Sequence, residues 1–199
     1  MVPAIEIRNL TKDFTTDFWK PKFRSLEDVS FSVMEEGIFG LIGHNGAGKT
    51  TAIKILIGLL KPTSGTVLVF GQPVTDSKVK QWIGFLPENA YYYEYLKAGE
   101  ILHFYGKLFG MGKRDRDRKV DELLELVGLR DRAQDKLKTF SKGMLQRIGI
   151  AQALMNDPKL VILDEPMSGL DPLGRKEVRD IILRLAEKKK TILFSSHIL

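Results

Sequence analysis

The chain has 199 residues, 43% of them hydrophobic, which suffices for one folded domain with a sizeable core. It contains no cysteine, so disulfide bonds and thiol chemistry are excluded. The net charge is +6, from 31 basic and 25 acidic residues spread along the chain, and this modest excess does not predict a nucleic-acid-binding protein.

Short apolar runs recur along the chain and predict seven β-strands, at 4–9, 28–33, 37–42, 65–70, 82–86, 159–163 and 190–195. Helical patterns lie between several of these runs. This alternation is typical of an α/β domain with a mainly parallel sheet. The first strands follow one another closely, so we expect an antiparallel β portion near the N-terminus.

The stretch GHNGAGKTT follows the predicted strand 37–42 and precedes a predicted helix at 52–60. Its spacing is that of a phosphate-binding loop, in which glycines bring backbone N–H groups and a helix N-terminus close to one anion. A glycine-rich turn that matches by chance is the alternative, but the flanking strand and helix argue against it. We therefore predict a nucleoside triphosphate site at Gly43, Asn45, Gly46, Ala47, Gly48, Lys49, Thr50 and Thr51.

Three side chains of this loop have distinct expected roles. Lys49 bridges the outer phosphates as a point charge, and the Thr50 hydroxyl takes one coordination place on Mg²⁺. Thr51 supports an inner phosphate. A nucleoside triphosphate and Mg²⁺ are thus the expected ligands of this loop.

Residues 98–155 interrupt the alternation, because they carry helical patterns without a strand between them. Val120, Leu123, Leu124 and Val127 fall on one face of the second pattern, and Gly128 is placed to end that helix. We expect a helical lobe, at about 89–155, inserted into the sheet domain.

The stretch LVILDEP is an apolar strand that ends in two carboxylates, Asp164 and Glu165. Consecutive side chains of a strand point to different sides, so the two acids can have different roles. Downstream of a phosphate loop, Asp164 is expected to hold Mg²⁺ through water and Glu165 to deprotonate an attacking water. The next strand, in TILFSSH, delivers His197 to the same edge of the sheet.

The stretch SKGMLQR, at 141–147, completes a set of motifs that resembles the ATP-binding cassette of ABC transporters. The resemblance covers essentially all 199 residues. It implies a P-loop NTPase core in which GHNGAGKTT is the Walker A loop and LVILDEP is Walker B. FSKGM corresponds to the signature motif LSGGQ, SGLD at 168–171 to the loop that crosses to a partner, and His197 to the switch histidine.

The resemblance also implies further site residues. Phe14 stands where an aromatic ring stacks on adenine, with Phe18 and Trp19 as alternatives. Glu88 occupies the place of a glutamine that contacts the metal and the attacking water. Ser141 and Gly143, in FSKGM, are expected to contact the nucleotide bound by a second chain.

Three positions depart from the family pattern. Glu88 is a carboxylate where an amide is usual, so ATP affinity is expected to depend more on metal. Lys142 and Met144 replace Gly and Gln, whereas Ser141 remains as a helix N-cap and Gly143 still permits close approach. These variants resemble those of cassettes that serve ABC-2-type exporters.

The implied partners are a second copy of the cassette, which completes an ATP sandwich, and transmembrane permease subunits. The sequence has neither a secretory signal pattern nor an apolar run of about 18 residues, so a cytoplasmic location is expected, on the inner face of the membrane. The chain stops two residues after His197, where family members continue, and we expect it to be truncated there.

Three other functions fit the sequence less well. A soluble ABC ATPase acting on ribosomes or DNA would usually carry two cassettes or long coiled coils, and neither is present here. A binding module that never hydrolyses ATP does not account for Glu165 and His197. A P-loop kinase or GTPase does not account for FSKGM upstream of LVILDEP.

Overall fold

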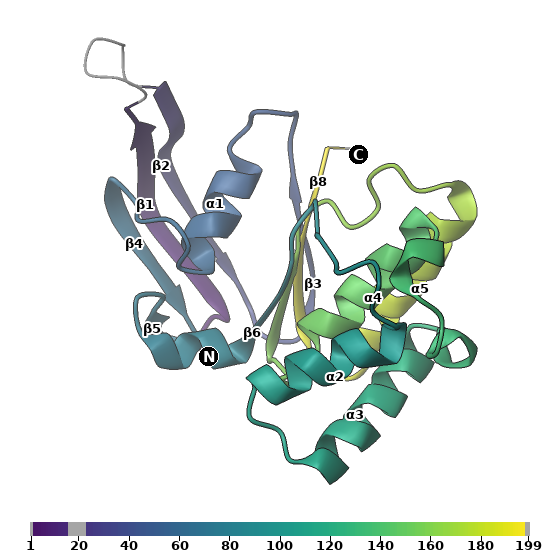
Figure 1. Cartoon of the computed structure of the whole chain (residues 1–199). Coiled ribbons are helices and arrows are strands. Elements are labelled where there is room, and N and C mark those ends of the chain that lie inside the picture. The colour runs from purple at the N-terminus through teal and green to yellow at the C-terminus, as the bar shows by residue number, and fades with distance from the viewer. Residues whose placement is uncertain (1, 16–22, 198–199) are drawn as a thin grey trace.

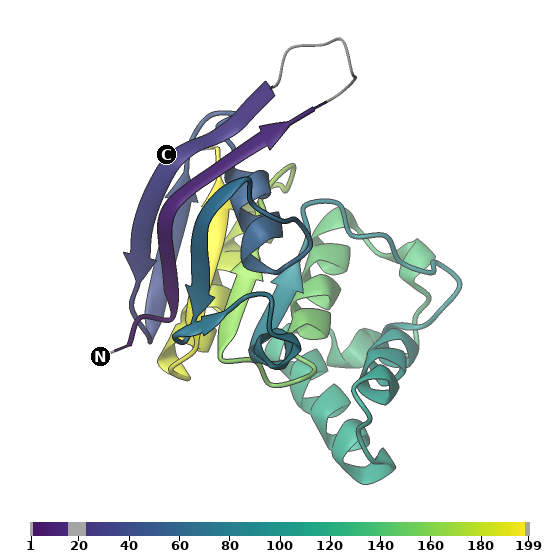
Figure 2. The same cartoon turned by 90° about the vertical axis from the view of Figure 1, so that its left-hand side faces the viewer.

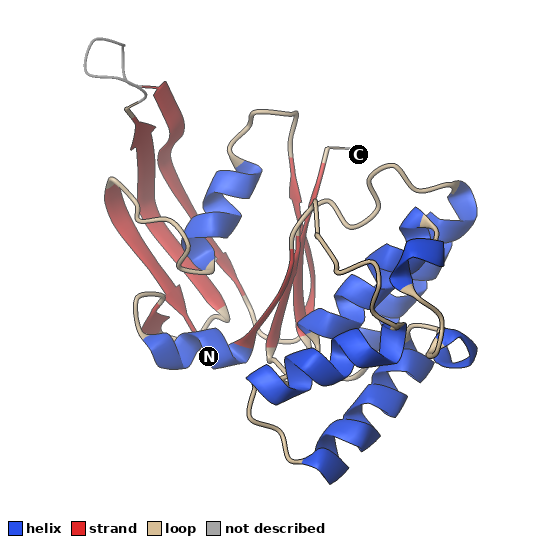
Figure 3. Ribbon diagram, viewed as in Figure 1, coloured by secondary structure: helices blue, strands red, loops and turns tan. Residues whose placement is uncertain are grey.

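The computed structural model describes residues 2–15 and 23–197. Within them, an antiparallel sheet, a parallel sheet and a group of helices lie side by side (Figure 1). Figure 2 gives the perpendicular view, and Figure 3 separates strands from helices by colour. The chain thus has the expected α/β organisation, with an antiparallel β portion near the N-terminus.

The antiparallel sheet has the strand order β2-β1-β4-β5 and is built from β1 (Ile5–Phe14), β2 (Phe23–Val33), β4 (Ser64–Val69) and β5 (Gln72–Pro73). Its inward face is apolar, and Ile5 and Val69, which are opposite one another, are fully buried. The hydrophobic alternation along β1 therefore fixes which face packs inward. Strand β5 was not predicted, because its two residues are too few to show a period.

The parallel sheet has the strand order β3-β8-β7-β6 and consists of β3 (Gly37–Ile42), β6 (Ile83–Leu86), β7 (Leu160–Leu163) and β8 (Thr191–Ser196). Leu163 is paired with Leu86 on one side and Phe194 on the other. All residues of β7 are buried, as expected for an apolar strand covered on both faces. Since the strands are parallel, the segments that follow them all leave from one edge of the sheet.

Helix α1 (Lys49–Leu56) lies between the two sheets (Figures 1 and 3). Its apolar side, which includes Ile53 and Ile55, is buried with residues of both sheets. The sequence predicted this helix at 52–60, and the observed helix begins and ends earlier. The glycine loop directly precedes its first residue, and Gly58, at φ +71°, turns the chain after its last.

The remaining helices are α2 (Ala98–Leu108), α3 (Lys113–Leu126), α4 (Lys142–Ala153) and α5 (Pro172–Glu187), with 3₁₀ turns at Ser77–Trp82, Arg130–Arg132 and Leu137–Thr139. The predicted apolar face of α3, Val120, Leu123, Leu124 and Val127, is buried. Gly128, at φ +64°, follows the end of α3 as predicted. The core of these helices is continuous with β6 and β7, and the boundary of a lobe at 89–155 stays a prediction.

Candidate active site

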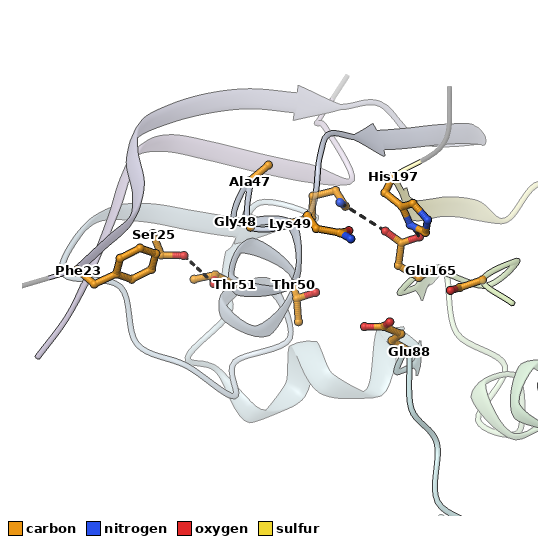
Figure 4. A pocket seen from close by; sticks show the side chains of 13 residues that line it. Phe23, Ser25, Ala47, Gly48, Lys49, Thr50, Thr51, Glu88, Glu165 and His197 are labelled. Carbon is orange, nitrogen blue, oxygen red and sulfur yellow. Dashed lines mark hydrogen bonds and ion pairs between the residues drawn. The ribbon is translucent and has the colours of Figure 1, made fainter. Parts of the chain in front are cut away.

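A cavity of about 640 Å³ lies at the carboxyl edge of the parallel sheet, where the segments after β3, β6, β7 and β8 meet (Figure 4). It is lined by Phe23, Ser25, Asn45, Gly46, Ala47, Gly48, Lys49, Thr50, Thr51, Glu88, Glu165, Ser168 and His197. Ten of these thirteen residues were predicted from sequence, since the lining contains every predicted residue except Phe14, Gly43, Ser141, Gly143 and Asp164. The fold therefore gathers one site from these four segments and from β2, which supplies Phe23 and Ser25.

The glycine loop adopts backbone conformations that favour glycine. Gly46 and Gly48 have φ values of +84° and +85°, in the left-handed region. A Cβ atom at position 48 would lie 2.5 Å from the carbonyl oxygen of Ser25, so this glycine also allows the loop to pass close to β2. The loop leads directly into the N-terminus of α1, which is the arrangement that binds phosphate.

The side chain of Lys49 is 8% exposed and is held at the rim of the loop. Its Nζ atom donates hydrogen bonds to the carbonyl oxygens of Gly43, at 2.6 Å, and His44, at 3.2 Å. The same ammonium group lies 3.4 Å from Oε1 of Glu165. A buried positive charge thus faces the cavity between the loop and the end of β7.

Asp164 and Glu165 follow β7 and make different contacts, because the backbone turns between them. Asp164 continues the strand, with its N–H donating to the carbonyl oxygen of Leu86 at 2.9 Å. Glu165 has φ +49°, an uncommon conformation for a residue other than glycine. Oε1 of its carboxylate forms the ion pair with Lys49, and Oε2 lies 2.7 Å from Nδ1 of His197.

Asp164 is 2% exposed and does not line the cavity, although it contacts a residue that does. Its Oδ1 atom accepts hydrogen bonds from the hydroxyl of Thr50, at 3.4 Å, and from the hydroxyl of Ser195, at 2.6 Å. The first contact joins the end of β7 to the first turn of α1. Asp164 and Thr50, both predicted to serve the metal, are therefore neighbours.

Ser195 was not singled out from the sequence. It lies on β8, is fully buried, and its hydroxyl also accepts a hydrogen bond of 2.7 Å from the backbone N–H of Glu165. A serine inside an apolar strand is a signal, since a buried hydroxyl needs a partner, but the sequence does not identify that partner.

Glu88 follows β6 and lines the cavity, and in Figure 4 its carboxylate and the Thr50 hydroxyl both point toward the space between α1 and Glu165. Thr51 is on the other side of α1, where its hydroxyl oxygen lies 2.9 Å from the hydroxyl oxygen of Ser25. Thr50 and Thr51, the predicted metal ligand and the predicted ligand of an inner phosphate, thus lie on different sides of α1 in one cavity.

The predicted adenine contact, Phe14, lies beside the cavity and not in its lining. It is paired across the sheet with Phe23, so the two rings share one face, and Nζ of Lys12 lies 5.1 Å from the centre of the Phe14 ring. Phe23 does line the cavity and is 59% exposed. Phe18 and Trp19, the alternatives, are outside the described residues.

Ser141 and Gly143 begin α4, away from the cavity lining. Ser141 is the N-cap that was predicted, because its hydroxyl accepts the N–H of Met144 at 3.3 Å. A Cβ at position 143 would meet no atom closer than 3.9 Å, so packing within this chain does not require a glycine there. The structure of one chain does not bring these two residues to Lys49.

The family model for ABC transporters matches residues 26–168, more than half of the chain. The chain belongs to that family. Its sequence is 50% identical over 199 residues to an uncharacterised ABC transporter ATP-binding protein of Synechocystis, sll0415, with 98% of this chain and 56% of that relative covered. It is 43% identical to the bacitracin transport ATP-binding protein BcrA of Bacillus licheniformis, with 100% and 63% covered.

The fold of this ABC cassette matches solved structures as well. A dimeric, post-hydrolysis state of the ATP-binding cassette MJ0796, bound to ADP and Pi, has a TM-score of 0.86 at 26% identity, over 98% of this chain and 88% of that one. The chain spans little more than half the length of curated relatives that it matches, 56% and 58% for two of them. Within the described residues, no helix is long and apolar enough to cross a membrane.

Proposed function

We propose that this cassette binds ATP with Mg²⁺ in the cavity and hydrolyses it, to power the movement of a substrate across a membrane. The observation that carries the proposal is the convergence of Lys49, Glu165 and His197 behind a loop shaped to bind phosphate. The MJ0796 cassette, which holds ADP and Pi, supports the same ligand class here.

Hydrolysis requires a base within reach of the water that attacks the γ-phosphate. Loop N–H groups and Lys49 bind the phosphates. Glu165 Oε1 is 3.4 Å from Lys49 Nζ, so a water next to the γ-phosphate lies within its reach, and the carboxylate takes the proton of that water. Nδ1 of His197 holds the other carboxylate oxygen and orients the base.

Mg²⁺ fits the oxygen atoms at the end of β7. The described residues contain no cluster of three or more His, Cys, Asp or Glu that could hold an ion by themselves. Mg²⁺ commonly uses one or two carboxylates together with substrate phosphates and waters, and Thr50, Asp164 and Glu88 supply such a partial set. When bound, the ion neutralises charge on the phosphates.

Each active site is shared between two copies of the cassette. Ser141 and Gly143 do not line the cavity of their own chain, and the open space around Gly143 suits the approach of another molecule. In a twofold dimer the N-terminus of α4 in one copy would meet the γ-phosphate bound by the other. ATP then favours the closed dimer, and hydrolysis releases it.

A mixing experiment tests both the activity and the sharing. Lys49→Ala and Ser141→Arg are each expected to be inactive. Every site of the first homodimer lacks the lysine that binds phosphate, and in every site of the second an arginine blocks the N-terminus of α4. Their heterodimer contains one site that joins an intact Lys49 to an intact Ser141. Random assortment makes about half of the dimers mixed, so the mixture should recover about a quarter of wild-type ATPase activity if sites act independently.

The controls are wild-type protein at the same concentration and two affinity tags that prove the mixed dimer. Wild-type protein without ATPase activity would contradict the proposed reaction. An active wild type with proven heterodimers and no recovery would contradict independent shared sites, and signature contacts in an ATP-bound structure then separate coupled sites from sites within one chain.

Exposed tyrosines between β6 and α2 suggest where permease subunits bind on the inner face of the membrane. Tyr91 is 93% exposed, and Tyr93 and Tyr95, whose ring centres are 5.9 Å apart, are also exposed. Such aromatic side chains are enriched in protein interfaces. The segment begins directly after Glu88, so a partner bound there is connected to the active site. Replacing Tyr91 and Tyr93 by Ala should prevent copurification with the permease while leaving the basal ATPase rate unchanged.

A further inference from the structure

We propose that Ser195 is a positioning residue for ATP hydrolysis, which fixes the Asp164 carboxylate and the Glu165 backbone with one hydroxyl group. This inference rests on the function proposed above. Ser195 is fully buried and does not line the cavity, so it does not touch the nucleotide itself. Its effect on the reaction must pass through the two acidic residues.

The hydroxyl of Ser195 lies between a donor and an acceptor from the neighbouring strand end. It accepts the N–H of Glu165 at 2.7 Å and donates its proton to Oδ1 of Asp164 at 2.6 Å. Because the carboxylate accepts the only hydroxyl proton, the oxygen is left to accept the backbone N–H. The hydroxyl thus donates one hydrogen bond and accepts one, and the orientation of each partner is defined.

The bond to Glu165 acts at the point where the chain leaves its strand conformation. Glu165 has φ +49°, and such a conformation persists in a residue other than glycine only where its surroundings hold it. The carbonyl oxygen of Glu165 accepts the N–H of Ser168, so the turn is held on both sides of the residue. Ser195 thereby directs the Glu165 side chain toward Lys49 and His197.

The bond to Asp164 acts on a carboxylate that is almost completely removed from water. Oδ1 of Asp164 is shared by Ser195 and by the hydroxyl of Thr50, at 3.4 Å. Since Asp164 and Thr50 are the proposed ligands of the metal ion, Ser195 orients a carboxylate of the proposed metal site. Loss of such a partner typically costs about 10- to 100-fold in metal affinity or activity.

Thr191 provides a matched control on the same strand. Its side chain is 2% exposed, and its hydroxyl accepts the N–H of Glu36 at 3.0 Å, at the opposite end of β8 from the site. Thr191→Val therefore removes a buried hydroxyl from β8 without changing the site. A general effect of losing a hydrogen bond in this strand would be equal in the two positions.

The first measurement is amide hydrogen exchange in protein without nucleotide or metal. Ser195→Ala should speed exchange of the Glu165 amide, whereas Thr191→Val should leave it unchanged.

The second measurement is steady-state ATP hydrolysis over a range of Mg²⁺ concentrations. Ser195→Ala should lower kcat and raise the Mg²⁺ concentration needed for half-maximal activity, each by about 10- to 100-fold. KM for ATP at saturating Mg²⁺ should change little, because Lys49 and the loop are intact. Ser195→Thr, which keeps the hydroxyl, should restore most of the lost activity.

Unchanged exchange at Glu165, or a Mg²⁺ dependence equal to wild type, in Ser195→Ala would overturn the inference. An equal loss of kcat in Thr191→Val would do the same. If Ser195→Ala does not fold, Ser195→Cys replaces it, because the thiol has a similar size and is a weak hydrogen-bonding group. Wild-type protein without ATPase activity overturns the proposed function instead, while the exchange measurement still tests the contact.

Discussion

The ammonium group of Lys49 and the carboxylate of Glu165 form an ion pair of 3.4 Å in which both side chains are less than 10% exposed. One partner is the proposed phosphate ligand and the other is the proposed base. A phosphate that binds to Lys49 must therefore approach the carboxylate of Glu165. Binding and chemistry are carried by adjacent groups, and substitutions should separate them.

Glu165→Gln should keep ATP binding and lower turnover about 10²- to 10⁴-fold, the usual effect of losing a general base. The amide has the size of the carboxylate, cannot accept the proton, and removes a negative charge beside the phosphates. Lys49→Ala should instead weaken ATP binding. Equilibrium titration and single-turnover hydrolysis measure the two steps, and normal turnover in Glu165→Gln would show that another group is the base.

Phe23→Ala should weaken the binding of ATP and GTP alike, by about 1 to 3 kcal/mol, because an aromatic ring stacks on any purine. Phe14→Ala is the matched variant on the adjacent strand, and the resemblance to the family assigns the stacking to that residue. Phe23 lines the cavity, so we expect its substitution to cost more. Fluorescence titration with both nucleotides measures the affinities of the two variants. A larger loss of affinity in Phe14→Ala would show that Phe14 makes the stacking contact.

Glu88→Gln should make ATP binding less dependent on Mg²⁺. In the wild type a carboxylate faces the phosphate region, so removing the ion should weaken ATP binding through charge repulsion. The ratio of the ATP dissociation constants in EDTA and in Mg²⁺ should fall roughly tenfold in Glu88→Gln, the factor that about 1.4 kcal/mol gives. An unchanged ratio would place Glu88 too far from the phosphates to matter.

Asp157→Asn should lower stability at neutral pH and have less effect in acid. Hydrogen bonding to Lys190, at 2.9 Å, holds the pKa of Asp157 below its ordinary value, and this carboxylate also lies 3.5 Å from Lys119. A lowered pKa stabilises the fold above the unfolded value of about 3.9, and this stabilisation is lost as pH falls through the folded pKa.

The expected loss at pH 7 is about 0.2 to 1 kcal/mol, since the pair is at the surface. Asparagine tolerates the left-handed backbone at this position, where φ is +51°, so the substitution isolates the charge. Thermal unfolding of both proteins from pH 7 to pH 3 tests this, and a difference in Tm that does not shrink below about pH 4 would contradict it.

The parts of the site that could be predicted are those fixed by local sequence. The loop before Lys49, the acids after β7 and the histidine after β8 each follow an apolar strand, and parallel strands bring their carboxyl ends to one edge. Their convergence therefore follows from the order of the elements. The start of α5 was not predicted, although Asp171 as its N-cap and Pro172 as its first residue are typical sequence signals of a helix start.

The parts that could not be predicted depend on pairing between distant segments. Phe23 lines the cavity from β2, and its position depends on the pairing of β2 with β1, a register that periodicity within either strand does not define. Ser195 reaches Asp164 only because β8 lies beside β7, although 31 residues separate them. The signature residues Ser141 and Gly143 do not line the cavity of their own chain, so their role stays a prediction.

The register between β7 and β8 also limits how this chain can vary in evolution. Phe194 is paired with Leu163, and successive strand residues point to opposite faces, so the hydroxyl of Ser196 could not replace that of Ser195 in the bridge to Asp164. One residue inserted inside β8 would turn every later side chain to the wrong face. Insertions in the turn at Lys188–Lys190, before β8 begins, leave that register intact. Length variation among descendants of this sequence should therefore accumulate at the amino edge of the parallel sheet.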